Sequence, residues 1–236
     1  MKWDFLYRLF YKKQSASFIL TLALLGSTLT HSESIDFTDA NNHIPNGSAG
    51  NLDYKLSAHI LTLWPPHLSD GSVTYNINDS EKNGCVSAGT SLACDGDGLG
   101  INYNGNTDEI DGYFPFLHEI LKVELSSTNG LDIILETIEF LDLFAGEGAN
   151  ISINETVYST PGLYSDKGGY AITNLSSLNV GTNVVLKFFT NYNWESDFAV
   201  ARINVSQIPI PATVWLLGSA LLGFLGLRRL SQTSKD

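Results

Sequence analysis

Short runs of apolar and aromatic residues, separated by clusters of Asn, Gly, Ser and Asp, fill residues 34–207. No long stretch there follows the 3.6-residue period of an amphipathic helix, whereas several alternate with period two. In one run, Leu121, Val123 and Leu125 alternate with Lys122 and Glu124, as in a half-buried antiparallel strand. The pattern predicts strands at 35–38, 52–63, 72–78, 120–126, 131–143, 150–153, 170–173, 183–190 and 198–206.

One predicted strand contains a change of phase. Leu131, Ile133 and Leu135 lie at odd positions, but Ile138 and Phe140 lie at even ones. Such a change predicts either a β-bulge or a turn near position 136. Eight or nine short strands at this spacing predict an all-β domain over residues 32–207, a β-sandwich of jelly-roll-like topology.

Both ends of the chain differ from this body. Lys12 and Lys13 precede an apolar run at 16–25 and then small residues, as in a secretory signal peptide. We predict a signal peptide over 1–31, cleaved somewhere in 27–34. An uncleaved N-terminal anchor is the alternative, although the apolar run is short for crossing a bilayer.

The C-terminal segment combines two prolines, an apolar stretch and a pair of arginines. Residues 212–227 carry no charge and, as a helix, would be about 24 Å long, which spans the hydrocarbon core only marginally. Arg228 and Arg229 would place its end in the cytoplasm by the positive-inside bias, leaving a cytoplasmic tail at 231–236. Pro209 and Pro211 keep the preceding backbone extended and accessible to an enzyme.

The order of these features resembles the PEP-CTERM sorting signal, in its Val-Pro-Leu-Pro-Ala-like variant. The matching parts are Pro209, Ile210, Pro211 and Ala212, then the apolar helix, then Arg228 and Arg229. The resemblance implies a sorting segment at 208–230 with a transmembrane helix at 212–227. It also implies recognition by an exosortase-type transpeptidase, which removes the helix and passes the protein to the cell surface or exopolysaccharide matrix. An ordinary tail anchor is the alternative interpretation.

Charge and cysteine content agree with an exported domain. Of 13 basic and 25 acidic residues, 6 basic and 23 acidic fall in 32–208, a formal charge of −17. This balance disfavours nucleic acid and anionic lipid as partners. Cys85 and Cys94 are the only cysteines, and in an exported chain we expect them to form a disulfide rather than free thiols.

One acidic, Gly-rich segment is a candidate Ca²⁺ site. Its carboxylates and glycines would suit an ion that takes six to eight oxygen ligands, although the EF-hand spacing does not fit. An acidic turn whose side chains bond their own backbone is the alternative. The segment at 94–112 also resembles one found in PEP-CTERM and related extracellular β-sandwich proteins, a resemblance that extends to about residue 153. The candidate ligands are Asp95, Asp97, Asp108, Glu109 and Asp111.

Three functions remain open. We favour a non-enzymatic structural protein of the cell surface or matrix. The alternative is a Ca²⁺-dependent glycan-binding module with Trp64, Tyr192 and Trp194 as stacking residues. A glycoside hydrolase using a pair such as Glu136 and Glu139 is the least favoured, because no histidine lies in a recognised catalytic motif and positions on the solvent face of strands explain the acids.

Overall fold

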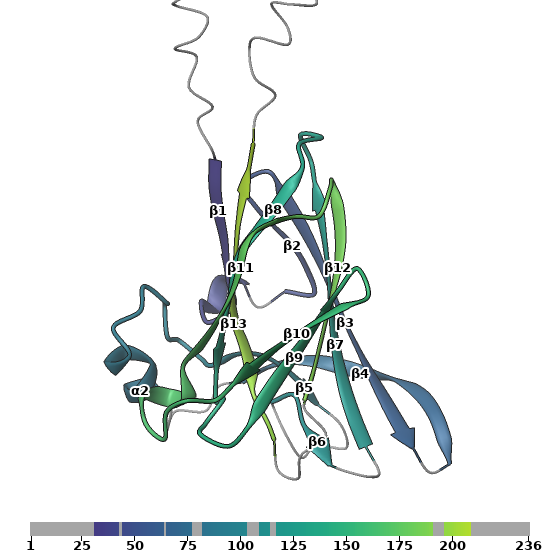
Figure 1. The fold of residues 1–236 in the computed structure, drawn as a ribbon, viewed down its shortest axis with the longest axis vertical. Helices are drawn as coiled ribbons and strands as arrows, with labels where there is room; N and C mark the ends of the chain where they lie inside the picture. The colour runs from purple at the N-terminus through teal and green to yellow at the C-terminus, as the bar shows by residue number, and fades with distance from the viewer. Residues whose placement is uncertain are drawn as a thin grey trace, which may run out of the picture. The chain divides into compact units, whose positions relative to one another are not determined.

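The computed structural model describes residues 31–42, 44–63, 65–76, 82–102, 109–113, 117–190 and 196–208. Residues His31–Gln207 fold together as one structural unit. This unit is built almost entirely of antiparallel strands (Figure 1), which confirms the predicted all-β class. Among the described residues, no helix has the length and hydropathy needed to cross a bilayer. The predicted signal peptide and the sorting segment from Pro209 onward lie outside the described residues.

The strands form two antiparallel sheets. One has the order β4-β5-β13-β8-β11, with β1 also paired to β13; the other has the order β10-β9-β12-β7-β3-β4, with β2 on β3 and β6 on β7. We call them the β13 sheet and the β7 sheet. The bounds are β1 His31–Asp36, β2 Asn46–Ala49, β3 Leu52–Leu63, β4 Pro66–Asn76, β5 Gly98–Asn102, β6 Gly112–Tyr113, β7 Leu117–Ser127, β8 Ile133–Leu141, β9 Gly148–Ile153, β10 Thr156–Pro161, β11 Ala171–Asn179, β12 Asn183–Thr190 and β13 Ala199–Gln207.

Strand β4 connects the two sheets. Its first half pairs with β3 up to Gly71, and its second half pairs with β5 from Ser72 onward. A Cβ at Gly71 would meet side-chain carbons of Ile60, Ala58 and Ile101 at 3.1–3.3 Å. Strand β4 therefore changes sheet at a glycine, where the absence of a side chain lets its backbone lie close to the side chains of β3 and β5.

A single apolar core lies between the sheets. Along β12 the side chains alternate between exposed and buried, and Val184, Leu186 and Phe188 point into the core. From the other sheet, Phe140 packs its ring edge-on against Phe188. Strand β13 is buried along nearly its whole length, because a second layer covers its outer side.

That layer contains a short helix and the disulfide. Helix α2 (Lys82–Ser87) and the 3₁₀ turn η2 (Lys167–Gly169) lie against each other, and a Cβ at Gly84 would meet the backbone of Gly168 at 2.2 Å. Cys85 and Cys94 form the predicted disulfide and pack with Leu92, Leu141 and Ala201. A second 3₁₀ turn, η1 (Ala40–Asn42), follows β1.

The predicted bulge in 131–143 is confirmed, and the alternative of a turn is wrong. Strand β8 is continuous, but Asn204 pairs with Thr137 and Val205 with Leu135, so Glu136 is the additional residue. The bulge shifts the inward-facing set from odd to even positions, which explains the phase change in the sequence.

Part of the acidic, Gly-rich segment forms strand β5, which was not among the predicted strands. Gly98 has a φ of +125°, and a Cβ there would lie 2.3 Å from the carbonyl oxygen of Val200. Glycine at this position therefore permits close approach to β13.

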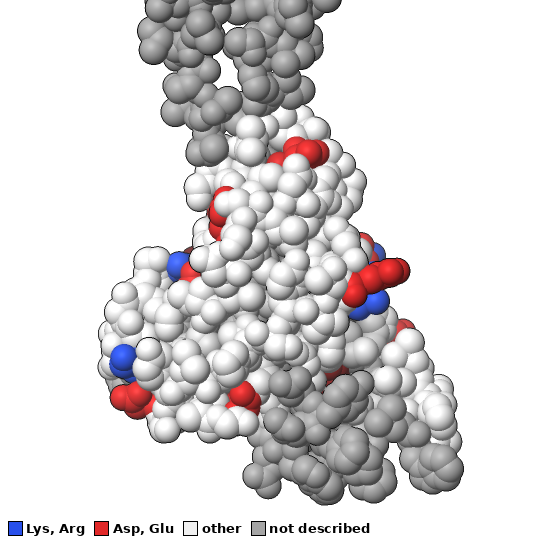
Figure 2. Space-filling view, viewed as in Figure 1, with Lys and Arg blue, Asp and Glu red and all other residues white. Residues whose placement is uncertain are grey.

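Charged side chains are sparse on the face of the molecule shown in Figure 2. Where basic groups are visible, they lie next to acidic ones, and the other acidic groups stand apart from one another. The negative charge of the body is therefore not gathered into one patch on this face.

Candidate functional site

Three carboxylates from two separate parts of the chain converge at one place in the described structure. Glu109, Asp111 and Asp197 each offer an oxygen, and these oxygens all lie within 4.8 Å of one another. Two further acids, Glu119 and Glu147, interact with members of this group. We call these five residues the carboxylate cluster.

The local backbone explains why the three central acids face the same way. Ile110 is fully buried and donates its N–H to the carbonyl of Phe198 at 2.8 Å, and Gly112 forms a bridge with Ser196. Since side chains alternate along extended backbone, burying Ile110 turns Glu109 and Asp111 to the opposite side. Asp197 faces them in the same way, because it lies between buried Ser196 and buried Phe198.

Glu119, on β7, lies on the inner side of the cluster. Its side chain is 1% exposed, and its carboxylate accepts the backbone N–H of Asp111 at 2.9 Å. Burial raises the pKa of Glu119 to about 8; the hydrogen bond from Asp111 opposes this shift, and the charge of Asp111 adds to it. This carboxyl group is therefore costly to ionise in the protein alone.

Glu147 is the fifth member and precedes β9. Burial raises the pKa of Glu147 to about 7, the N–H of Phe144 lowers it, and the charges of Asp197 and Glu109 raise it further. Neighbouring negative charges thus oppose ionisation here as they do at Glu119. A cation bound among these oxygens would remove that repulsion.

The donor set suits a hard cation. Carboxylate oxygens from several residues at mutual distances below 5 Å are the ligands that Ca²⁺ prefers. Of the predicted ligands, Glu109 and Asp111 belong to this group. Asp97, which is 1% exposed, and Asp95, which is exposed, are not in the group of three, and Asp108 lies outside the described residues.

Asp197 and Glu147 were not predicted as ligands. Their positions depend on Gly112 bridging to Ser196, and on Ser196 donating to and accepting from the backbone of Gly148 through its hydroxyl. These contacts join segments 48 and more residues apart, and no local pattern encodes them.

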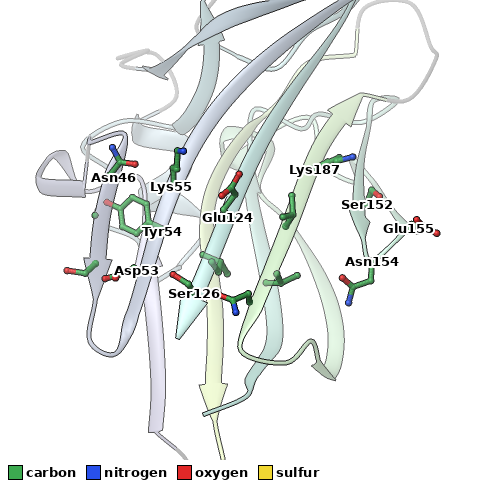
Figure 3. Close-up of a pocket in the computed structure, with 16 residues that line it drawn as sticks. Asn46, Asp53, Tyr54, Lys55, Glu124, Ser126, Ser152, Asn154, Glu155 and Lys187 are labelled. Carbon is green, nitrogen blue, oxygen red and sulfur yellow. The ribbon is translucent and has the colours of Figure 1, made fainter. Parts of the chain in front are cut away.

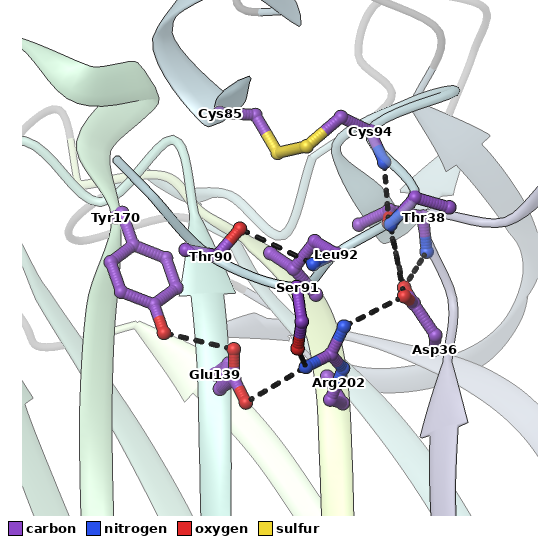
Figure 4. The surroundings of a disulfide bond; sticks show 11 residues. Asp36, Thr38, Cys85, Thr90, Ser91, Leu92, Cys94, Glu139, Tyr170 and Arg202 are labelled. Atoms are coloured by element: carbon purple, nitrogen blue, oxygen red, sulfur yellow. Dashed lines mark hydrogen bonds and ion pairs between the residues drawn. A yellow bond between two sulfur atoms is a disulfide. The ribbon is translucent and has the colours of Figure 1, made fainter. Parts of the chain in front are cut away.

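The second polar cluster lies beneath the disulfide (Figure 4). Arg202 contacts Asp36 at 2.9 Å and Glu139 at 3.6 Å, and it donates a hydrogen bond to Ser91 at 2.8 Å. Tyr170 donates to Glu139 at 2.9 Å. We call these five residues the Arg202 network.

The Arg202 network extends to the disulfide through Thr38. The Thr38 hydroxyl donates to Asp36 at 2.6 Å and accepts the N–H of Cys94 at 3.0 Å. The N–H of Ala93 also donates to Asp36. The network therefore joins the disulfide loop to β1, β8 and β13.

The acids named for a glycoside hydrolase take part in structural contacts. Glu139 belongs to the Arg202 network and also accepts a hydrogen bond from Asn204. Glu136, at the bulge, accepts hydrogen bonds from the hydroxyls of Ser177 and Ser206, both at 2.6 Å. Trp64, Tyr192 and Trp194 lie outside the described residues.

Comparison with known proteins shows no family. No family model matches the chain, and no curated protein matches it. Among solved structures, the insecticidal crystal protein Cry2Aa is similar at 16% sequence identity and a TM-score of 0.29. That match covers 39% of this chain and 16% of the other protein, and at such a TM-score it carries no argument about fold or function.

Proposed function

We propose that this chain is an exported structural protein of the cell surface or extracellular matrix, sorted by an exosortase-type transpeptidase and without enzymatic activity of its own. The observation that supports export best is the Cys85–Cys94 disulfide, because disulfides persist in oxidising compartments. The segment from Pro209 to Arg229 supplies the sorting signal and a transient membrane anchor.

The domain that reaches the surface is a jelly-roll-like β-sandwich. Its support is the strand order, β5-β13-β8-β11 in one sheet and β7-β12-β9-β10 in the other. From β5 to β13, with the two-residue β6 set aside, the chain crosses to the other sheet at every step except the β9–β10 hairpin, as in two Greek keys. Strands β3 and β4 extend the sheets beyond β7 and β5, while β2 pairs with β3 and β1 with β13. Such a sandwich can form a surface layer without a catalytic site.

Intact-mass measurement of the protein extracted from the cell surface tests the sorting proposal. We expect a mature form that has lost residues 1–31 and ends near Pro211. The substitution of both Pro209 and Pro211 by Ala should leave a longer product in the membrane fraction. A wild-type mature form that still ends at Asp236 would contradict sorting and identify a tail-anchored protein.

A second candidate function is a Ca²⁺-dependent glycan-binding module, favoured by the carboxylate cluster. Asp197 follows Trp194 by three positions and Tyr192 by five, so an ion held by Asp197 would be bound close in sequence to both predicted stacking residues. In this candidate function, Glu109, Asp111 and Asp197 are the first ligands of Ca²⁺.

Isothermal titration of the full chain in mild detergent with Ca²⁺ tests this second function. We expect heat of binding for the wild type and for the control Asp166→Asn, which changes an exposed acid outside the cluster. Asp197→Asn should bind at least about tenfold more weakly, since it removes one charged ligand. Equal binding by Asp197→Asn and the wild type would place any Ca²⁺ site elsewhere.

A further inference from the structure

A broad groove crosses the outer face of the β7 sheet, away from the carboxylate cluster. It has a volume of about 840 Å³ and runs over β2, β3, β7, β12 and β9. Figure 3 shows side chains from neighbouring strands directed into it, among them Lys55, Glu124, Ser126 and Lys187. The four strands from β3 to β9 give it a width of about 14 Å at the usual strand spacing.

The strand register aligns the groove's polar groups in rows across the strands. In one row, Asp53 pairs with Ser126, which pairs with Asn183. In a second row, Lys55 pairs with Glu124. Each row thus places hydrogen-bond donors beside acceptors, about 5 Å apart across the sheet.

A third row links the polar groove to an apolar one. Lys187 and Ser152 pair with each other and line both the large groove and a smaller adjoining pocket. The smaller pocket contains Phe189, Ile120 and Leu61. The face is therefore amphipathic along its length, with a half-buried aromatic ring at one end.

The rim of the groove is set by a tight hairpin. Asn154 and Glu155 form the two-residue turn between β9 and β10, and both have positive φ, +48° and +69°. On the opposite side, β2 lies close to Tyr54, since a Cβ at Gly47 would be 2.3 Å from the tyrosine oxygen. Both sides of the groove, the β9–β10 turn and strand β2, therefore belong to the β7 sheet itself.

The charge balance of the face differs from that of the body. Two of the six basic residues in 32–208, Lys55 and Lys187, line the groove together with the acids Asp53, Glu124 and Glu155. Lys122 pairs with Lys187 across the strands and lies beside the groove. Lys122 and Glu124 form an ion pair. The groove is therefore close to neutral, whereas residues 32–208 carry −17 in total.

We propose that this groove binds a linear, neutral polysaccharide. The rows of Lys, Asn, Ser, Asp and Glu side chains need a ligand that both donates and accepts hydrogen bonds, and sugar hydroxyls do both. The apolar face of a sugar ring can also pack against an aromatic side chain such as Phe189. An anionic polymer would meet no net positive charge here and would be repelled by the body. The open, elongated groove takes a chain rather than a single sugar.

This inference deepens the proposed matrix role, on which it rests, by naming the polymer that the protein contacts. The two are tested separately. Binding is measured on the purified full chain and does not depend on C-terminal processing. Failed binding together with a processed C-terminus would reject the groove alone, and binding with an intact C-terminus at Asp236 would reject the sorting proposal alone.

Affinity electrophoresis of the full chain in mild detergent tests the groove, with hydroxyethylcellulose as the neutral polymer and polygalacturonate as the anionic one. We expect hydroxyethylcellulose to retard the wild type in the presence of EDTA. The double variant Lys55→Ala/Lys187→Ala should bind at least about tenfold more weakly, since each lysine can make a charge-assisted hydrogen bond. Ser126→Trp, which fills the middle of the groove, should abolish retardation.

Lys167→Ala is the matched control, because it removes an exposed lysine on η2, outside the groove, and should migrate like the wild type. Unchanged melting temperatures would show that the variants are folded. Absence of retardation by hydroxyethylcellulose, retardation by polygalacturonate alone, or undiminished binding by Ser126→Trp would each overturn the proposal.

Discussion

The Arg202 network and the carboxylate cluster are two ways of burying charge in one domain. In the Arg202 network, a guanidinium lies between Asp36 and Glu139, so the negative charges meet a positive one supplied by the chain. In the carboxylate cluster, the groups that shift the pKa of Glu119 and Glu147 are backbone N–H groups and other carboxylates. The first region carries its own cation, and we propose that the second binds one supplied from outside.

Removing the internal cation should have the largest effect. Arg202→Met would leave Asp36 and Glu139 facing each other in a buried site, and we expect a loss of about 3–5 kcal/mol in the free energy of unfolding. Urea unfolding monitored by circular dichroism measures it. The control Lys187→Met, at an exposed position, should change stability by less than about 0.5 kcal/mol. A loss below about 1 kcal/mol for Arg202→Met would show that the network contributes little.

Opening the disulfide should have the next largest effect. Cys85→Ser/Cys94→Ser removes a crosslink that closes a short loop, with a sequence separation of 9, and the chain-entropy model gives a loss of about 2–3 kcal/mol. Thermal melting of the double variant measures this loss. Wild type melted with a reducing agent should match the double variant, and a reduced wild type that melts like the oxidised one would contradict the prediction.

A substitution in the carboxylate cluster, Glu119→Gln, should have a smaller effect on the free energy of unfolding, and it should stabilise the protein. Because the pKa of Glu119 is raised to about 8 in the folded protein, its ionisation costs stability as pH rises from about 4.5 to 8. Glu119→Gln cannot ionise and keeps an oxygen that can accept the N–H of Asp111. In the absence of divalent cations, we expect Glu119→Gln to be more stable than wild type at pH 8 by about 1–3 kcal/mol.

The difference between Glu119→Gln and wild type should nearly disappear at about pH 4, where Glu119 is largely protonated in both the folded and the unfolded chain. Unfolding in urea at the two pH values, in EDTA, measures it. A variant less stable than wild type at pH 8 would mean that the ionised carboxylate already has a favourable partner within the chain.

The strands and the carboxylate cluster were not equally predictable from the sequence. Alternation gave the bounds of β3 and β12 to the residue, because each has one side facing the core. Strand β5 escaped prediction because its glycines are typical of turns, and the close approach to β13 that requires Gly98 is a long-range contact. β2 and β10 are short and largely polar edge strands, without a clear apolar period.

Two members of the carboxylate cluster, Glu109 and Asp111, were predicted from the sequence because acidic residues are frequent in the segment 94–112. No motif surrounds Asp197 in the sequence, and it reaches the cluster because Gly112 bridges to Ser196 and Ile110 donates its N–H to Phe198. Asp95 and Asp97 are close to Glu109 in sequence but precede strand β5, whereas Glu109 follows it. Proximity along the chain was therefore a poor guide to proximity in space.

We proposed that the carboxylate cluster, unlike the Arg202 network, is completed by a cation from outside the chain. The melting temperature of the full chain at pH 8, measured with and without Ca²⁺, tests this difference most directly. If the carboxylate cluster is completed by a cation, Ca²⁺ at about 100 times its dissociation constant should add about 2.7 kcal/mol and raise the wild-type melting temperature by about 5–10 °C. Asp197→Asn, which we expect to bind at least about tenfold more weakly, should show no more than about half of this rise, and Asp166→Asn should show all of it. A wild-type melting temperature unmoved by Ca²⁺, or an equal rise in Asp197→Asn, would contradict the account.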